Sequence, residues 1–492
     1  MKKNIFKLFL VCSVLFTAAS CSEDFLDKSP TEFINESDLA ATGKLNPVVL
    51  ESILNGIYAN MYTTGTGGTS NHDDLGQKGF DIYGDMLSSD MALSKGSYGW
   101  YTGLTQLKET IDYTENTNYK PWRFYYRIIR ASNLLIKALG GNDAVVEGVN
   151  AYNLAQAKAM RAFSYFYLTQ YYIKEYDPNA KVLPLYNSPD QPNQPKSLTK
   201  DIYDLMISDL EQAVTLLDGF ERKAKYQINQ DVAKGLLAYV YAATGTSENN
   251  LKALAIAEDV AATNPITTKE DLTGGFNNVD TPSWIWGVDI TVDQNLGLVS
   301  FWGQIDIYTY SYAAVGNTKS MDKNLFDQIR ENDYRKAQFF NTPGHKFELT
   351  PYKKFYNENR KIFGNRTVTD DYVYMRTEEM ILLAAEMAAK ENKEGVAKSH
   401  LTNLLSNRFD DAKDYAYIDG LSGQDLLDEI SLQTRIEMWG EGKSYLNMKR
   451  NKLTTNRGPN HLNHVGEDIK YNDERLTFEI PQAEIQDNPF IN

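Results

Sequence analysis

Two segments of the chain combine aromatic residues with glycines in a pattern suited to ligand binding. In residues 96–103 (Gly-Ser-Tyr-Gly-Trp-Tyr-Thr-Gly), glycines bracket Tyr98, Trp100 and Tyr101, and no helical or strand periodicity buries the rings. Aromatic faces can stack on the C–H faces of a sugar ring, while polar side chains around them bind its hydroxyl groups. We therefore predict that Tyr98, Trp100 and Tyr101 contact a ligand, the alternative being a loop that touches none.

The second segment is residues 301–312, in which Trp302 follows a glycine-containing turn. Tyr308, Tyr310 and Tyr312 alternate along the segment, and alternating residues of an extended chain share one face. We predict Trp302, Tyr308 and Tyr310 as further ligand-binding residues. The alternative is a half-buried strand whose tyrosines pack inward.

Another aromatic run favours the core instead. Trp284 and Trp286 lie on one strand face with Val288 and Ile290, and this apolar company is typical of a buried strand. We therefore leave both tryptophans out of the predicted site.

The sequence contains no convincing catalytic or metal-binding motif. A glycosidase needs two carboxyl groups about 5 to 10 Å apart, and with 65 acidic residues adjacent pairs such as Glu378-Glu379 indicate nothing specific. Glu379 is better explained by an ion pair with Arg376, three residues earlier. His72-Asp73-Asp74 could hold calcium, although a solvated turn is the simpler interpretation. We predict no catalytic residue, no metal ligand and no cofactor.

Composition excludes other classes of function. The 492 residues include 42% hydrophobic residues, which is typical of a globular protein rather than a disordered one. Lys and Arg number 50 against 65 Asp and Glu, a net charge of −15 that repels nucleic-acid phosphates. Nucleic acid is therefore excluded as an expected partner, whereas the 32 tyrosines supply many flat faces with polar tips.

The N-terminus has the pattern of a secretory signal. Lys2, Lys3 and Lys7 precede an apolar run, and small residues lead directly to Cys21. This layout resembles a bacterial lipoprotein signal, in which residues 1–20 are removed and Cys21 carries acyl chains. The only other cysteine, Cys12, lies inside the signal, so disulfides and cysteine metal sites are excluded. The alternative is a secreted protein with a free cysteine near its start.

Helical periodicity predominates along the rest of the chain, so we predict a mostly α fold. Residues 21–265 form an N-terminal helical part, and residues 266–492 begin irregularly and return to helices, with both parts packed as one unit. A shift of 74 residues overlays Ala159 on Ala233, which is a weak sign of repeated helix pairs of the tetratricopeptide type. Helices are predicted over residues 154–171, 201–217 (with Thr199 as the N-cap), 230–244, 251–262, 375–390, 396–407 and 424–439.

Several segments, taken in order, resemble the SusD/RagB family of outer-membrane nutrient-binding lipoproteins. The resemblance covers nearly the whole mature chain. Two residues depart from the family pattern, Lys443 and Asn447, and we interpret them as altered helix packing. The matching segments are Cys21 with Phe25-Leu26-Asp27 and Ser29-Pro30, Trp122 to Asn133, Arg161 to Leu168 with Tyr171, Leu183-Pro184-Leu185, Ile202 to Leu217, Arg376 with Ala385-Glu386, Leu401-Thr402-Asn403 with Arg408, Arg435 to Arg450, and Ile480-Pro481-Gln482 with Asn488-Pro489.

The resemblance implies a non-catalytic receptor with a SusD-like fold: a single large unit of tetratricopeptide-like helix pairs plus an irregular, strand-poor part bearing the ligand face. Members bind an oligosaccharide, or in some branches a peptide, and deliver it to a SusC-like TonB-dependent transporter. The expected location is the outer membrane, by a lipid anchor on Cys21, facing the cell exterior. Glu23 and Asp24 after the cysteine are similar to the family's surface-export signal.

Three other functions remain open at this point. The chain could bind a peptide as a member of the same family, act as a helical-repeat scaffold for other proteins, or hydrolyse glycosides at the surface. The sequence does not identify the glycan, its linkage or the transporter.

Overall fold

Helices dominate the structure, which confirms the predicted mostly α fold. The computed structural model describes residues 47–356 and 361–491 of the chain. The helices are α3 (Pro47–Ala59), α4 (Gln77–Leu87), α5 (Thr102–Thr105), α6 (Asn116–Ala138), α7 (Val149–Tyr172), α8 (Thr199–Leu216), α9 (Gln230–Thr244), α10 (Ser247–Thr263), α11 (Lys269–Thr273), α12 (Phe301–Ile305), α13 (Lys323–Gln328), α14 (Thr377–Lys390), α15 (Glu394–Leu405), α16 (Gly423–Glu437), α17 (Lys443–Arg450) and α18 (Gln482–Asp487). The strands are β1 (Met91–Leu93), β2 (Lys181–Pro184), β3 (Lys196–Leu198), β4 (Trp284–Val288), β5 (Lys319–Met321), β6 (Tyr372–Arg376), β7 (Thr454–Asn456) and β8 (Asp468–Lys470).

Local sequence signals explain where several helices begin and end. α9 begins after Asn229, whose side chain accepts a hydrogen bond from the first turn, and it ends at Gly245, where φ is +66°. The prediction that Thr199 caps α8 is wrong, because Thr199 is the first helical residue. Its backbone N–H and its hydroxyl both donate to the carbonyl of Ala180, at 2.8 and 3.1 Å, so Thr199 joins α8 to the loop before β2.

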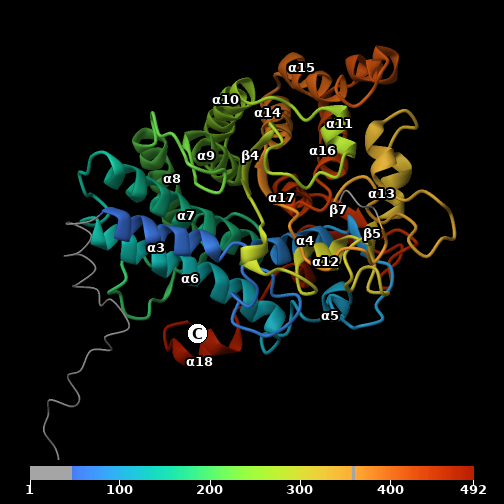
Figure 1. The fold of residues 1–492 in the computed structure, drawn as a ribbon. Coiled ribbons are helices and arrows are strands. Elements are labelled where there is room, and N and C mark those ends of the chain that lie inside the picture. The colour runs from blue at the N-terminus through green and yellow to red at the C-terminus, as the bar shows by residue number, and fades with distance from the viewer. Residues whose placement is uncertain (1–46, 357–360, 492) are drawn as a thin grey trace, which may run out of the picture.

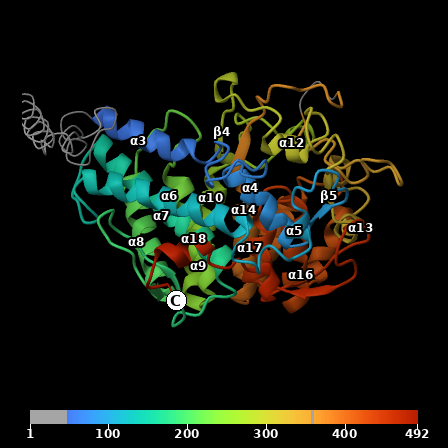
Figure 2. The same ribbon diagram turned by 90° about the horizontal axis from the view of Figure 1, so that it is seen from below.

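Consecutive helices pack pairwise into one continuous array. α6 packs on α7, α7 on α8, α8 on α9 and α9 on α10, and α10 then packs on α14, which contacts α15 and α16. Figures 1 and 2 show α6, α7 and α8 on one side of the molecule, and α5, α13 and β5 on the other. One large cluster of buried side chains runs from α3 to the C-terminal segment, so this array and the irregular part share a core.

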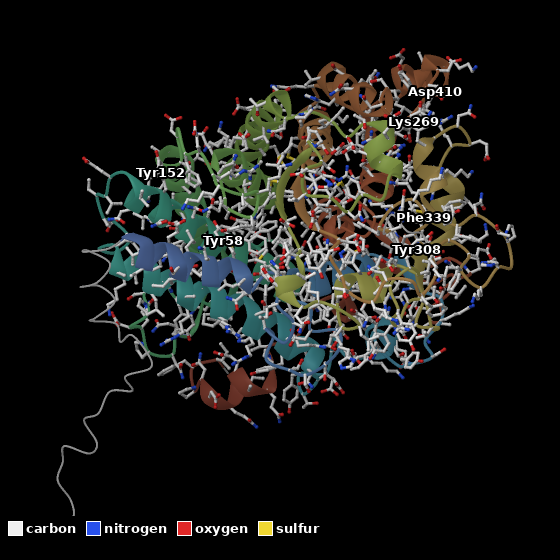
Figure 3. The ribbon with its side chains drawn as sticks, viewed as in Figure 1. Tyr58, Tyr152, Lys269, Tyr308, Phe339 and Asp410 are labelled. Atoms are coloured by element: carbon white, nitrogen blue, oxygen red, sulfur yellow. The ribbon has the colours of Figure 1, made fainter. Side chains whose placement is uncertain are left out.

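The first described helix, α3, is fastened to this array by buried hydrogen bonds. The hydroxyl of Tyr58 donates to Gln156 Oε1 of α7 at 2.8 Å and accepts a bond from the backbone N–H of Ile228 at 3.0 Å (Figure 3). α3 also packs against both α6 and α7.

Within the described residues, every helix is too short or too polar to span a lipid bilayer.

The strands form four two-stranded antiparallel sheets. β4 pairs with β6, and Trp284 and Trp286 of β4 are each 1% exposed, which confirms that they belong to the core. β1 pairs with β5 although the two strands are separated by more than 200 residues of chain. This small sheet joins the two aromatic segments of the sequence.

A network of buried ion pairs follows β6. The guanidinium group of Arg376 contacts Glu437 at 2.7 Å and Glu441 at 2.8 Å. The predicted ion pair between Arg376 and Glu379 is wrong, since Glu379 accepts the backbone N–H of Arg376 and forms its ion pair with Lys443 at 3.2 Å. The network connects β6, α14, α16 and the turn before α17.

Candidate functional site

The loop after β1 lies alongside the segment before β5. Beyond the paired strands, the backbone N–H of Ser97 donates to the carbonyl of Gly316 at 3.0 Å. Gly316 has φ +112°, and a Cβ atom there would come within 2.8 Å of Ser97 Oγ. Only glycine allows this close approach of the two segments. Residues 94–101 and 310–318 therefore lie side by side at the surface.

Four side chains from three separate segments meet here, and we call them the aromatic cluster: His72, Tyr98, Trp100 and Tyr312. The rings of His72 and Trp100 are stacked, with centres 5.3 Å apart and 20° between their planes. Tyr312 contacts Trp100 edge-on at 6.2 Å and Tyr98 edge-on at 5.4 Å. His72 Nδ1 is also hydrogen-bonded to the Tyr312 hydroxyl.

The aromatic cluster is open to solvent. Tyr98 is 54% exposed, and Trp100, His72 and Tyr312 are half-buried. Trp100 also packs against the main buried cluster, and the four rings contact one another, so their orientation is held before any ligand arrives. A prearranged set of aromatic faces can bind a flat apolar surface, such as the C–H face of a sugar ring, at low entropic cost.

Buried polar residues support the aromatic cluster from below. Lys319 Nζ donates to Gln304 Oε1 at 2.6 Å, and Gln304 Nε2 donates to the carbonyl of His72 at 2.9 Å. Asn317 Nδ2 donates to the carbonyl of Trp100 at 3.4 Å. Burial lowers the pKa of Lys319 well below its usual value, although the charge of Asp73 opposes the shift. α12 and the residues at and just before β5 thus position the loop that carries His72 and the loop that carries Trp100.

Tyr101 does not belong to this open face. It is 4% exposed, and its φ of +65° at the start of α5 turns the side chain inward. Its ring contacts Tyr83 edge-on at 5.9 Å and lies 4.4 Å from Lys319 Nζ. The burial of Tyr101 therefore contradicts the prediction that this residue contacts a ligand.

Trp302 is likewise a core residue, with 1% of its surface exposed. Residues 301–305 form α12 rather than an extended segment, because the Ser300 side chain accepts the N–H of Gly303 and caps a helix. Trp302 Nε1 donates to the carbonyl of Asp370 at 2.8 Å, and the ring packs edge-on against Phe355 at 5.6 Å. The expectation that Trp302 is an exposed platform is wrong.

The two tyrosines predicted with Trp302 differ in exposure: Tyr308 is buried and Tyr310 is exposed. Tyr308 is 2% exposed and donates its hydroxyl to the carbonyl of Tyr352 at 3.3 Å (Figure 3), so its predicted contact with ligand is also wrong. Tyr310 is 44% exposed and stacks under the guanidinium group of Arg366, 4.0 Å from the ring centre. Tyr308 and Tyr310 do not share a face because the segment turns after α12. Tyr310 remains a candidate at the margin of the site.

The sequence pattern pointed to Tyr98 and Trp100 but missed His72 and Tyr312. Tyr312 was visible as the third member of the alternating tyrosines, and His72 stood in a polar run considered for calcium. The two acids of that run have other partners: Asp73 contacts Lys120 Nζ at 2.5 Å, and Asp74 accepts the N–H of Gly67 at 2.9 Å. In the described part of the chain, no group of three metal-ligating side chains converges.

Comparisons with known proteins agree with this architecture. The family described as "Starch-binding associating with outer membrane" (SusD-like) matches residues 24–242, and the SusD family itself matches residues 303–492. The two matches together cover most of the chain: the first includes α3 to most of α9, and the second runs from within α12 through α14 to the C-terminal segment. The chain belongs to the SusD/RagB family.

Individual relatives show how far the likeness extends. A SusD-like protein of Bacteroides ovatus is 26% identical over 243 residues, a stretch that covers 48% of this chain and 39% of that relative's length. A SusD-like carbohydrate-binding protein from Bacteroides vulgatus superposes with a TM-score of 0.74 at 24% identity, covering 90% of this chain and 96% of its own. The surface glycan-binding protein A of Bacteroides uniformis gives a TM-score of 0.65 at 18% identity, covering 91% and 99%. At these identities the structures establish the SusD fold alone.

Proposed function

We propose that this SusD-family chain is a cell-surface glycan-binding lipoprotein. It captures an oligosaccharide by stacking a sugar on the aromatic cluster and delivers it, chemically unchanged, to a SusC-like TonB-dependent transporter in the outer membrane. The observation that carries the proposal is the open set of rings of Tyr98, Trp100 and Tyr312, assembled from two distant segments and supported from below. Aromatic faces with polar groups at their edge are the usual means of recognising sugars.

The anchor is part of the same proposal. Cys21 lies outside the described residues, and its acylation stays a prediction from the signal pattern. More than one acyl chain on a single cysteine would hold the protein durably at the membrane surface. Glu23 and Asp24 support a position on the exterior face, where the aromatic cluster would meet glycans from outside the cell.

Electrophoresis through gels containing single polysaccharides tests the binding function. The mature chain with Cys21→Ser, which is soluble without acylation, is run against a panel of neutral and acidic glycans, and released reducing sugar is assayed in parallel. Retarded migration without sugar release is the expected result, and loss of retardation in Trp100→Ala would place binding at the aromatic cluster.

The other outcomes distinguish the remaining functions. Release of sugar would identify a glycoside hydrolase, and retention by peptides alone would identify the peptide-binding alternative. No retention by either ligand, together with stable co-purification of other proteins, would identify a scaffold. Delivery is tested separately, by purifying the acylated protein from its native outer membrane and asking whether a TonB-dependent transporter comes with it.

A further inference from the structure

An exposed guanidinium group lies beside the segment that carries part of the aromatic cluster. Arg366 is exposed, and its guanidinium group lies over the ring of Tyr310, 4.0 Å from the ring centre. Tyr310 stands two residues before Tyr312 of the cluster, so the Cα atoms of these two tyrosines are at most about 7 Å apart. The positive charge of Arg366 therefore borders the face on which we propose that a sugar stacks.

Backbone hydrogen bonds hold the segment of Arg366 against the segment of Tyr310. The N–H of Tyr310 donates to the carbonyl of Asn365 at 2.7 Å, and the N–H of Asn365 donates to the carbonyl of Tyr308 at 3.0 Å. The Asn365 side chain also donates to Asp370 Oδ2 at 3.3 Å. Because the backbone next to Arg366 is held in this way, its side chain emerges at a fixed place beside Tyr310.

Arg366 has no carboxylate partner. Within the described residues, its side chain forms neither an ion pair nor a hydrogen bond. Lys269 provides a contrast, since it lies over the ring of Tyr334 at 3.9 Å and is also paired with Asp410 at 3.2 Å (Figure 3). The N–H donors of a guanidinium group lie in its plane, so the ring beneath Arg366 leaves them available to a ligand.

The surface around the aromatic cluster is locally positive. Lys95 and Lys346 are both exposed, and Lys95 Nζ donates to the carbonyl of Lys346 at 2.9 Å. Acidic residues are absent from four segments that carry or border the cluster: 94–103, 295–300, 308–318 and 361–369. The whole chain has a net charge of −15, but at physiological ionic strength charges farther away than about 8 Å are largely screened. The nearby cations therefore determine which ligands this face attracts.

This combination of groups favours an acidic sugar over a neutral one. A neutral sugar offers Arg366 only hydroxyl groups, whereas a carboxylate accepts two parallel N–H bonds from a guanidinium group, each roughly twice as strong as a bond between neutral groups. A uronic acid carries its carboxylate at the edge of the ring, so its C–H face is still free to stack on an aromatic side chain. One sugar chain can therefore use both the aromatic cluster and Arg366.

We propose that the ligand of the aromatic cluster is an acidic glycan, in which the carboxylate of a uronic acid pairs with Arg366. This inference rests on the proposed glycan-binding function and adds the chemical class of the ligand. Arg366 is then the residue that selects acidic over neutral glycans. Lys95 and Lys346 favour the approach of the acidic chain through their charge.

Pairs of polysaccharides that differ only in the carboxylate test the proposal. Polygalacturonate, alginate and hyaluronan are each compared with their carboxyl-reduced forms, in which a CH₂OH group replaces the carboxylate and every linkage is kept. The soluble mature chain with Cys21→Ser is titrated with both members of each pair. We expect it to bind at least one of the acidic glycans about tenfold more tightly than its reduced form, because hydrogen bonds to charged groups are the stronger ones.

Two substitutions at Arg366 and one elsewhere identify the residue responsible. Arg366→Gln should lower the affinity for the acidic glycan about tenfold and leave the affinity for its reduced form unchanged. Arg366→Lys keeps the charge but loses the planar pair of donors, so its affinity should fall between those of Arg366→Gln and the starting protein. The matched control is Arg130→Gln, which removes the same charge from an exposed position on α6 and should change neither affinity.

The outcomes separate this inference from the proposed function. Equal affinities for the acidic glycan and its reduced form, or equal effects of Arg366→Gln and Arg130→Gln, would overturn the inference and leave glycan binding intact. Binding of dextran sulfate or polyglutamate without binding of any uronic-acid polysaccharide would also overturn it, since the ligand would then be a sulfated glycan or an acidic peptide. No binding of any glycan, acidic or neutral, would refute the proposed function itself.

Discussion

The imidazole of His72 lies nearly parallel to the indole of Trp100, with ring centres 5.3 Å apart. This stack covers one side of the indole, and the edge contact with Tyr312 limits its rotation. Trp100 is therefore a fixed platform rather than a loop side chain that must be ordered by the ligand. A binding site of this kind loses little conformational entropy when it is occupied.

Replacement of Trp100 should weaken glycan binding strongly. We expect Trp100→Ala to cost about 1 to 3 kcal/mol of binding free energy, the range for one central aromatic anchor. The half-buried position of the ring predicts only a small loss of stability. Isothermal titration with the glycan identified by gel retardation measures the effect.

Tyr113→Ala is the matched control for that experiment. Tyr113 is 44% exposed and lies before α6, where its carbonyl accepts the N–H of Gln482 at the start of α18. Its removal should leave affinity unchanged. Equal affinities of the wild type and Trp100→Ala would move the site elsewhere, with Tyr310 as the next candidate.

Replacement of Trp302 should lower the free energy of unfolding, because the residue is buried and does not contact the ligand directly. The side chain is buried among Phe301, Phe355 and Tyr372, so Trp302→Ala should cost about 3 to 5 kcal/mol of the free energy of unfolding. Trp302→Phe should cost less, because it leaves a smaller cavity. Denaturant titration measures both, and a fully stable Trp302→Ala would contradict the burial of this residue.

Loss of one carboxylate from the buried ion network should strongly lower the free energy of unfolding. Glu437 contacts Arg335, Arg376 and Arg408 at 3.1, 2.7 and 2.8 Å. Burial alone would raise the pKa of Glu437, but these arginines hold it well below its usual value. Glu437→Gln leaves their charges poorly compensated and should cost about 3 to 5 kcal/mol of the free energy of unfolding.

The control for this variant is Glu474→Gln. The Glu474 side chain is 73% exposed and only 3.9 Å from Lys174, a surface pair. Its loss should change the free energy of unfolding by no more than about 0.5 kcal/mol. Similar stabilities for the two variants would show that the network contributes little.

The buried carboxyl group of Asp306 should lower the free energy of unfolding as the pH rises from about 4 to about 8. Burial raises the pKa of Asp306 to about 8, with the charge of Asp370 adding to the shift. Between its unfolded value near 4 and about 8, the folded protein keeps a proton that the unfolded chain has released. One such group lowers the free energy of unfolding by up to about 1.4 kcal/mol per pH unit.

The variant Asp306→Asn isolates this contribution. An amide still accepts the N–H bonds of Tyr308 and Thr309 but cannot ionise. The difference between the unfolding free energies of Asp306→Asn and the wild type should therefore widen from pH 5 to pH 8. The exposed Asp218→Asn should show no such trend, and parallel curves for Asp306→Asn would refute the raised pKa.

Removal of the proposed lipid anchor should release the protein from the membrane. Cys21→Ala removes the acylation site, so the protein should move from the membrane fraction to the soluble fraction, with no change in the fold of residues 47–356 and 361–491. Mass spectrometry of the N-terminal peptide checks acylation directly. Acyl chains found on the variant would contradict the assignment of Cys21.

Much of the fold could be predicted from the sequence because helical periodicity and capping are local. The apolar stripe of residues 154–171 lies within α7, and Asn229 and Gly245 bound α9 as expected. The core position of Trp284 and Trp286 followed from their apolar neighbours on the same strand face. Each of these features depends on residues close together in the chain.

The site depended on contacts that no local pattern contains. Residue type and spacing were enough to single out the loop with Tyr98 and Trp100, because its glycines leave no periodic face to bury. Tyr101 and Trp302 resembled exposed rings equally well, but a positive φ turned the first inward and the Ser300 cap made the second part of a buried helix. The pairing of β1 with β5 brought Tyr312 beside the loop with Trp100, and the hydrogen bond from Gln304 to the carbonyl of His72 placed His72 there, since long-range packing decides which aromatic rings face water.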